Sequence, residues 1–268
     1  MDILMEKKYE YKGMLVHYYI CGDKDKEVIV LLHPAFADHR IFKEQFKGLS
    51  HKYCLIAIDM ISHGKSQLGS ARANMGDMPE VVQRVLAEEG VSKAHVLGVS
   101  LGSIVAQGVA KDYPEVVKTV TMVGGYSIHS ENKELKRKQG LEMVKWIFYM
   151  IFSIKAFRRY VVNFSVDSQQ GKAVFMEGIS LFKRESFKGL QGMSTMFNAI
   201  GKIVDYPLLA VYGEYDLELT KAAGKQLENS VANSRYVEIE GAGHCANIDK
   251  PEEFNCLLDE FISFNSGR

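Results

Sequence analysis

Ser100 has the surroundings in this sequence that most clearly suggest chemistry. It is the central residue of the segment 98–102, Gly-Val-Ser-Leu-Gly, which follows the apolar run 94–97 and precedes the helix-like segment 103–110. A strand, a tight turn and a helix in this order lift the central side chain out of the backbone, and the flanking glycines remove side chains that would collide there. The pattern predicts a nucleophilic serine. A glycine-rich turn that only packs a helix on a strand is the alternative, so the assignment depends on its context.

An acid and a histidine follow the serine at the ends of two later apolar runs. The run 207–212 leads into Asp216, and the run 235–240 leads into His244. Serine, aspartate and histidine, each just beyond the carboxyl end of a predicted strand, stand in the triad order of α/β-hydrolases. By this resemblance Ser100 is the nucleophile, His244 the general base and Asp216 the acid that orients the imidazole.

The resemblance to the α/β-hydrolase superfamily covers both halves of the chain. Residues 31–36 resemble the oxyanion loop of that superfamily, and residues 59–66 resemble its loop after the fourth strand. The resemblance implies an α/β-hydrolase fold, with a mostly parallel eight-stranded sheet flanked by helices and a helical cap inserted after the sixth strand. The implied core spans residues 1–125 and 204–268, and the implied cap spans residues 126–203.

The resemblance also implies two backbone N–H donors for an oxyanion hole. Leu101, directly after the nucleophile, supplies one donor. Ala35, two residues after His33, supplies the other, with Phe36 as the alternative. Pro34 stands where such loops usually carry glycine. Proline has no N–H and a fixed φ, so this residue cannot be a donor and stiffens the loop.

The sequence contains rivals for the acid and for the base. Glu214 lies two residues before Asp216, but the family pattern Gly-x-x-Asp matches residues 213–216 and favours Asp216. Some relatives carry their acid after the sixth strand, where this chain has no carboxylate. His33 and His63 precede the serine, against the family order, and are predicted to fix their loops by hydrogen bonds.

Alternating strand and helix patterns explain how these residues come together. Apolar runs that predict buried strands occupy residues 27–32, 53–58, 94–97, 116–123, 207–212 and 235–240. Residues 8–11 and 14–20 predict an antiparallel hairpin. Apolar spacings of three and four predict helices over residues 74–89 and from Pro251 onward, the latter with Asp249 as its N-cap. The alternation implies a mostly parallel sheet with right-handed crossovers.

The stretch 126–203 interrupts this alternation, because it has helical patterns and no convincing strand. Residues 127–203 contain 13 Lys and Arg against 6 Asp and Glu, together with many aromatic residues. One interpretation is that apolar faces pack on the core while the cations are solvated. The other is an apolar acyl pocket with a basic rim that attracts anionic substrates. The candidate pocket residues are Trp146, Phe148, Tyr149 and Phe152.

Composition narrows the class of protein. The 268 residues carry 33 Lys and Arg and 33 Asp and Glu, so no net field favours nucleic acid. The 4 cysteines have neither disulfide-scaffold density nor metal spacing. The sequence has no metal-spaced cluster of His, Cys and carboxylates and no phosphate-binding glycine loop of the usual form, so we expect no cofactor and no metal. No apolar run is long enough to span a bilayer and the N-terminal residues show no cleavage signal, which predicts a cytoplasmic protein without stable membrane insertion. The oligomeric state stays open.

These features predict a cofactor-independent, carboxylesterase-like serine hydrolase. Its substrate would be a small ester or related acyl compound, cleaved through an acyl-enzyme at Ser100. A carbon–carbon-bond hydrolase or a perhydrolase with the same triad is an alternative, although Cys245 stands where carbon–carbon hydrolases tend to have tryptophan. From another class, a ligand-sensing regulatory protein with slow, incidental hydrolysis also fits.

Overall fold

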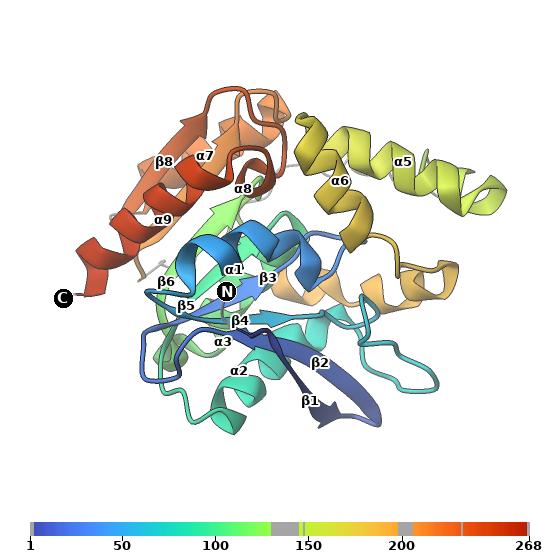
Figure 1. The fold of residues 1–268 in the computed structure, drawn as a ribbon, viewed down its shortest axis with the longest axis horizontal. Helices are drawn as coiled ribbons and strands as arrows, with labels where there is room; N and C mark the ends of the chain where they lie inside the picture. The colour runs from blue at the N-terminus through green and yellow to red at the C-terminus, as the bar shows by residue number, and fades with distance from the viewer. Residues whose placement is uncertain (1–2, 130–144, 147, 198–205, 232, 267–268) are drawn as a thin grey trace.

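A computed structural model of the chain describes residues 3–129, 145–146, 148–197, 206–231 and 233–266. Within these residues, eight strands form one sheet in the order β1-β2-β4-β3-β5-β6-β7-β8, with helices on both faces (Figure 1). β1 pairs antiparallel with β2, β2 pairs antiparallel with β4, and the other neighbouring strands are parallel. The strands are β1 (Met5–Tyr11), β2 (Met14–Cys21), β3 (Val28–Leu32), β4 (Cys54–Ile58), β5 (Ala94–Val99), β6 (Val117–Val123), β7 (Leu208–Gly213) and β8 (Ser234–Ile239).

The helices alternate with the strands, as predicted. The α-helices are α1 (Lys43–Leu49), α2 (Met78–Glu88), α3 (Leu101–Asp112), α5 (Ile154–Ser165), α6 (Gln169–Gly178), α7 (Glu218–Ser230), α8 (Ala246–Asp249) and α9 (Pro251–Ser266). Short 3₁₀ helices are η1 (His39–Phe42), η2 (Met75–Asp77), η3 (Pro114–Val116), η4 (Arg184–Leu190) and η5 (Met193–Phe197). The predicted fold class, a mostly parallel eight-stranded sheet flanked by helices, is confirmed.

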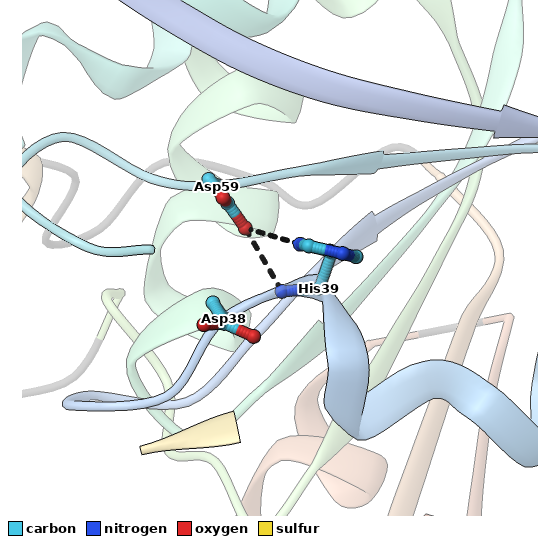
Figure 2. Close-up of side chains that lie close together, drawn as sticks. All are labelled: Asp38, His39 and Asp59. Carbon is cyan, nitrogen blue, oxygen red and sulfur yellow. Dashed lines mark hydrogen bonds and ion pairs between the residues drawn. The ribbon is translucent and has the colours of Figure 1, made fainter. Parts of the chain in front are cut away.

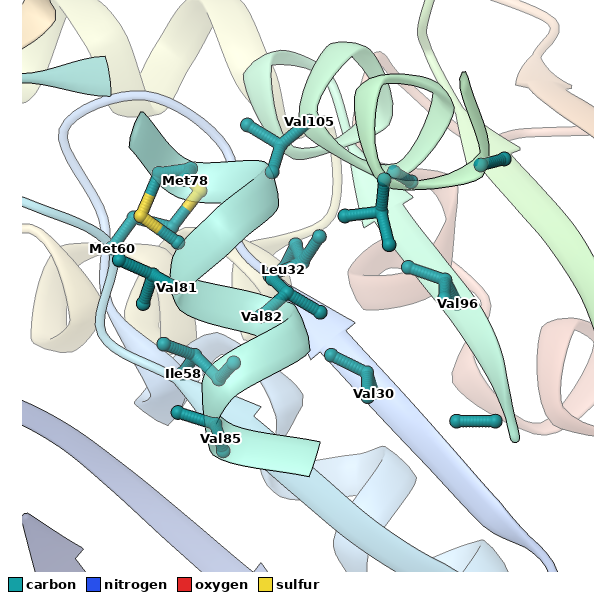
Figure 3. Packing of buried hydrophobic residues seen from close by; sticks show 14 of the residues in the cluster. Val30, Leu32, Ile58, Met60, Met78, Val81, Val82, Val85, Val96 and Val105 are labelled. Carbon is teal, nitrogen blue, oxygen red and sulfur yellow. The ribbon is translucent and has the colours of Figure 1, made fainter. Parts of the chain in front are cut away.

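The central strands are buried on both faces, which explains their continuous apolar character. Val30 and Leu32 of β3 face a cluster that includes Val82 of α2, and Figure 3 shows these side chains packed together. The intervening residues Ile29 and Leu31 face a second cluster on the other side of the sheet, which helix α9 helps to form. Burial of one such side chain stabilises the fold by about 1.5–3 kcal/mol. The two-sided core therefore holds the strand ends in place.

The parallel strands end at one edge of the sheet, where the loops after β3, β5, β7 and β8 meet. Helices α5 and α6 come between β6 and β7 in the chain, and Figure 1 shows them beside this edge. The described part of the predicted cap is helical. Residues 130–144 and 198–203 lie outside the described residues, so the cap boundaries at residues 126 and 203 stay predictions. No helix among the described residues is long and apolar enough to cross a membrane.

Candidate active site

Ser100 lies at a strained turn between β5 and α3. Its φ of 51° and ψ of −110° are in a region that side-chain-bearing residues rarely adopt, at a cost of about 1–3 kcal/mol. Its N–H donates to the carbonyl of Val123 at 2.7 Å, which ties the turn to β6. A Cβ atom at Gly98 would strike the carbonyl of Gly102, and one at Gly102 would strike the carbonyl of Leu32. The turn therefore needs both glycines of the motif.

Asp216 and His244 form a hydrogen-bonded pair at the ends of β7 and β8. Nδ1 of His244 lies 2.9 Å from Oδ1 of Asp216, and the carboxylate side chain is fully buried. Leu217 donates its N–H to the same oxygen at 2.7 Å. Burial lowers the pKa of His244, but the charge of Asp216 and the hydrogen bond raise it more, so the pKa lies above the ordinary 6.5. With its proton on Nδ1, the imidazole presents Nε2 as a base.

Glu214, the rival acid, has a different partner. Its Oε2 accepts a hydrogen bond of 2.9 Å from the backbone N–H of Gly241. The side chain thereby supports the loop that leads to His244, while Asp216 is the carboxylate that contacts the imidazole. This geometry favours Asp216 as the acid.

Gly124, which follows β6, makes room for the imidazole. Its φ is +59°, and a Cβ atom at this position would lie 2.8 Å from Nδ1 of His244. Its N–H donates to the carbonyl of Val211 in β7 at 2.9 Å. The absence of a side chain lets the end of β6 pass directly under the aspartate–histidine pair.

Ser100 and His244 line one cavity of about 70 Å³. Its remaining lining residues are Pro34, Ala35, Phe36, Trp146, Val161, Phe164 and Ser165. Both the loop after β3 and helix α5 thus contribute to the wall, so the core and the predicted cap share it. Pockets for drug-sized ligands measure roughly 300–1,000 Å³. The cavity is suited to a small group.

Comparisons with known proteins bear on the fold of the chain. A family model for the alpha/beta hydrolase fold matches residues 27–147. The chain is 23% identical over 256 residues to the pyrrolizixenacetamide deacetylase of Xenorhabdus hominickii, covering 90% of this chain and 93% of that protein. It is 21% identical over 263 residues to 3-oxoadipate enol-lactonase 2 of Acinetobacter baylyi, with 92% and 93% coverage. The chain therefore has the α/β-hydrolase fold. The structure of a thermophilic esterase from Thermogutta terrifontis has the same fold, with a TM-score of 0.81 at 16% identity and coverage of 97% and 98%.

The loop that resembles the oxyanion loop of α/β-hydrolases lies at the cavity. Ala35 and Phe36 both line it, and Leu101 begins α3 directly after Ser100. Phe36 has a positive φ of 73°, a conformation uncommon for a bulky residue. The residues predicted to donate to an oxyanion therefore lie around the serine, while the choice between Ala35 and Phe36 stays a prediction.

Two buried histidines hold the loops around the candidate site in place. Nδ1 of His33 lies 2.8 Å from the carbonyl of Pro34, and Nε2 accepts from the N–H of Met60 at 2.9 Å. Nδ1 of His63 lies 2.9 Å from the carbonyl of Ile61. Burial lowers the pKa of both imidazoles, that of His63 to about 3. The two are neutral, and their contacts match the predicted role of fixing loops.

Trp146 is the predicted pocket residue that reaches the cavity. The rings of Trp146 and Phe36 pack edge to face, with their centroids 5.1 Å apart. Phe36 makes similar edge contacts with Phe157 at 5.1 Å and Phe182 at 5.0 Å. Phe164, whose ring centroid lies 6.1 Å from that of His244, forms another part of the wall. Neither Phe36 nor Phe164 is predicted as pocket wall from the sequence.

The other predicted pocket residues lie elsewhere. Phe148 is 57% exposed and Phe152 is 71% exposed, and neither lines the cavity. Tyr149 stacks on Tyr160, with ring centroids 4.9 Å apart, and also lies away from the cavity lining. In this structure, none of these three predicted residues lines the cavity at Ser100. An aromatic segment with helical spacing does not reveal which of its faces meets the core.

A second polar cluster lies between the loops after β3 and β4, and no sequence pattern singles it out. Possible ligand atoms of Asp38, His39 and Asp59 all lie within 4.8 Å of one another, and Figure 2 shows the three side chains converging. Arg40 binds the carboxylate of Asp38 through Nε and a terminal nitrogen. The carboxylate of Asp59 accepts from N and Nδ1 of His39 and from the N–H of Lys65. Because protein donors already use these oxygens, the cluster fits a loop clamp and does not fit a metal site.

Proposed function

We propose that this α/β-hydrolase is a cofactor-independent, carboxylesterase-like serine hydrolase. Its substrate is a small ester or related acyl compound, which it cleaves through an acyl-enzyme at Ser100. The observation that carries the proposal is the shared cavity: Ser100 and His244 both line it, and Asp216 holds Nδ1 of the imidazole. A serine is a weak nucleophile unless a base takes its proton during attack. The contact between Asp216 and Nδ1 of His244 supports the imidazole as that base.

The mechanism follows from these positions. Oγ of Ser100 attacks the carbonyl carbon while Nε2 of His244 takes its proton, and Asp216 stabilises the resulting imidazolium. The oxyanion accepts hydrogen bonds from the N–H of Leu101 and from one N–H of residues 35–36. Collapse of this intermediate breaks the bond to the leaving group, which receives the proton from His244. A water molecule then attacks the acyl-enzyme by the same steps, releases the acid and restores the serine.

The size and lining of the cavity favour a short acyl group. A volume of about 70 Å³ between the rings of Phe36, Trp146 and Phe164 leaves little space beyond the reacting carbonyl. The names of the three relatives described above, a deacetylase, an enol-lactonase and an esterase, describe acyl chemistry, while other relatives are named as 2-hydroxy-6-oxononadienedioate hydrolases. Both observations support hydrolysis of a compact acyl compound.

A fluorophosphonate probe and a series of p-nitrophenyl esters test the proposal. The probe should label Ser100, and Ser100→Ala should abolish both labelling and ester hydrolysis while the protein stays folded. Ser263→Ala, which removes a hydroxyl from the exposed side of α9, serves as the matched control and should keep both activities. Labelling that persists in Ser100→Ala would contradict the assignment. Stoichiometric acylation without turnover would instead favour a ligand-sensing protein.

A further inference from the structure

Asp249, the last residue of α8, connects two distant parts of the chain. The residue is buried, with only 7% of its surface exposed. Oδ2 accepts hydrogen bonds from the N–H of Gly243 at 2.8 Å and of Asp167 at 2.9 Å, and Oδ1 accepts from the N–H of Ser168 at 2.8 Å. The sequence predicts Asp249 as the N-cap of α9. The carboxylate instead accepts from two backbone N–H groups that lie more than 80 residues earlier in the chain, and from one N–H group in the loop before His244.

We propose that Asp249 is a positioning residue that fastens the cap to the loop of the catalytic base. Gly243 immediately precedes His244, whereas Asp167 and Ser168 form the turn between α5 and α6. The end of α5 contributes Phe164 and Ser165 to the cavity wall. The carboxylate therefore holds the acyl-binding wall and the general base at a set distance. This inference rests on the proposed function, because it assigns the residue that aligns the acyl pocket with the triad.

The close approach of the two segments supports this role. The N–H of Cys245 donates to the carbonyl of Ser165 at 2.8 Å, a second bond between the same two segments. A Cβ atom at Gly243 would lie 3.1 Å from Oδ2 of Asp249, and one at Gly171 would lie 2.7 Å from Oδ1. Glycine on both sides leaves the space that the carboxylate occupies. Residues from α6, α8 and the histidine loop thus converge on one anionic group.

A carboxylate has a chemical advantage at this position. Both of its oxygens are acceptors, and hydrogen bonds to an ionised acceptor are stronger than those between neutral groups. An asparagine side chain has nearly the same shape but carries one oxygen and one NH₂ group. In either orientation of such an amide, the NH₂ group would face at least one backbone N–H. Asp249→Asn therefore weakens the connection, because at least one backbone N–H loses its acceptor and the remaining bonds lose their ionised acceptor, with little change in volume.

Trp146, the single tryptophan of the sequence, reports on the cap directly, because it lines the cavity. In Asp249→Asn, we expect acrylamide to quench the fluorescence of Trp146 about twofold more strongly. The backbone amides of residues 167, 168 and 243 should exchange with solvent on the order of tenfold faster, because their hydrogen bonds open more often. In the ester series, kcat/KM of the wild type should rise about threefold to fourfold per methylene until the cavity is full. In Asp249→Asn, the ratio of kcat/KM between successive esters should approach one.

Glu252→Gln is the matched control, since it removes an exposed carboxylate three residues away at the start of α9 and should change none of these readouts. Gly171→Ala tests the same contact from the cap side, and it should act in the same direction if Asp249→Asn fails to fold. A folded Asp249→Asn or Gly171→Ala protein with unchanged quenching, exchange and acyl-length dependence would overturn the inference. If the wild type hydrolyses no ester, the proposed function fails, while quenching and exchange still decide whether Asp249 fastens the cap.

Discussion

Asp216 with His244 and Asp59 with His39 form two aspartate–histidine pairs of nearly the same length. Nδ1 of the imidazole lies 2.9 Å from the carboxylate in the first pair and 2.8 Å in the second. Both carboxylate side chains are fully buried. Judged from either hydrogen bond alone, each pair could orient a general base.

The surroundings of the two pairs differ. His39 stacks on Tyr19 with ring centroids 3.4 Å apart, and both oxygens of Asp59 accept from protein donors. His244 lines a cavity together with Ser100. Oδ2 of Asp216 is buried and has no hydrogen-bond partner among the described residues. An aspartate–histidine pair therefore indicates catalysis only where the imidazole also faces a nucleophile and open space.

The largest expected difference between the pairs is in turnover. Asp216→Asn should lower kcat by about 10⁴-fold, because an amide at this position favours the wrong imidazole tautomer. Asp59→Asn should lower kcat far less in protein that remains folded. Glu214→Gln, the control on the neighbouring acid, should also have a small effect. Steady-state kinetics on a short p-nitrophenyl ester measures all three, and a larger loss in Glu214→Gln would identify Glu214 as the acid.

Stability should show the opposite order. Asp59→Asn replaces an acceptor that holds His39 and Lys65, so we expect it to lower the free energy of unfolding by about 2–3 kcal/mol. Asp216→Asn should lower it by less, since the Asp216 carboxylate already has one unpartnered oxygen among the described residues. Urea unfolding at neutral pH gives both values. Equal losses would mean that the Asp59 pair is not a structural clamp.

The pH dependence of activity sharpens the same contrast. His244 acts as a base only when neutral, so activity should fall as the pH decreases through its pKa, which Asp216 holds above the ordinary 6.5. Removal of the negative charge leaves burial as the dominant effect, which lowers the pKa. In Asp216→Asn we therefore expect the titration of His244, followed by NMR, to move to lower pH. An unchanged titration would contradict this electrostatic coupling.

The smallest expected effect concerns the acyl pocket. Trp146→Ala should enlarge the cavity and move the preferred ester one or more methylenes towards longer chains, with changes of about threefold to fourfold per methylene. Phe152→Ala, which truncates an exposed aromatic residue close to Trp146 in the chain, is the matched control and should leave the preference unchanged. Ester profiles of the two variants check this prediction. Identical shifts in both would place Phe152 at the pocket in solution.

The fold was predictable from sequence because its strongest signals are local. Strands such as β3 and β4 are buried on both faces, so each appears as a continuous apolar run. The turn at Ser100 was predictable for a similar reason, because nearby backbone atoms leave no room for a side chain at either of its two glycines. The Asp216–His244 contact required the family resemblance, because no local pattern pairs residues at the ends of two strands.

Other features depend on contacts that no local pattern encodes. The backbone partners of Asp249 in the cap lie more than 80 residues earlier, so the sequence suggests only a nearby helix cap. The orientation of the helical segment around Phe148 and Phe152 depends on how the cap docks, which helical spacing leaves undetermined. His39 of η1 stacks on Tyr19 of β2, which is not a neighbour of the preceding strand β3. Such arrangements arise only when the chain has folded.

Gly124 constrains how this enzyme could evolve. Some relatives carry the triad acid after the sixth strand, and that place in this chain is occupied by the glycine under the imidazole. A side chain at position 124 would need a positive φ and would begin 2.8 Å from Nδ1 of His244. A new carboxylate there would displace the histidine before it could orient it. Placing the acid at position 124 would therefore require the histidine loop to move first.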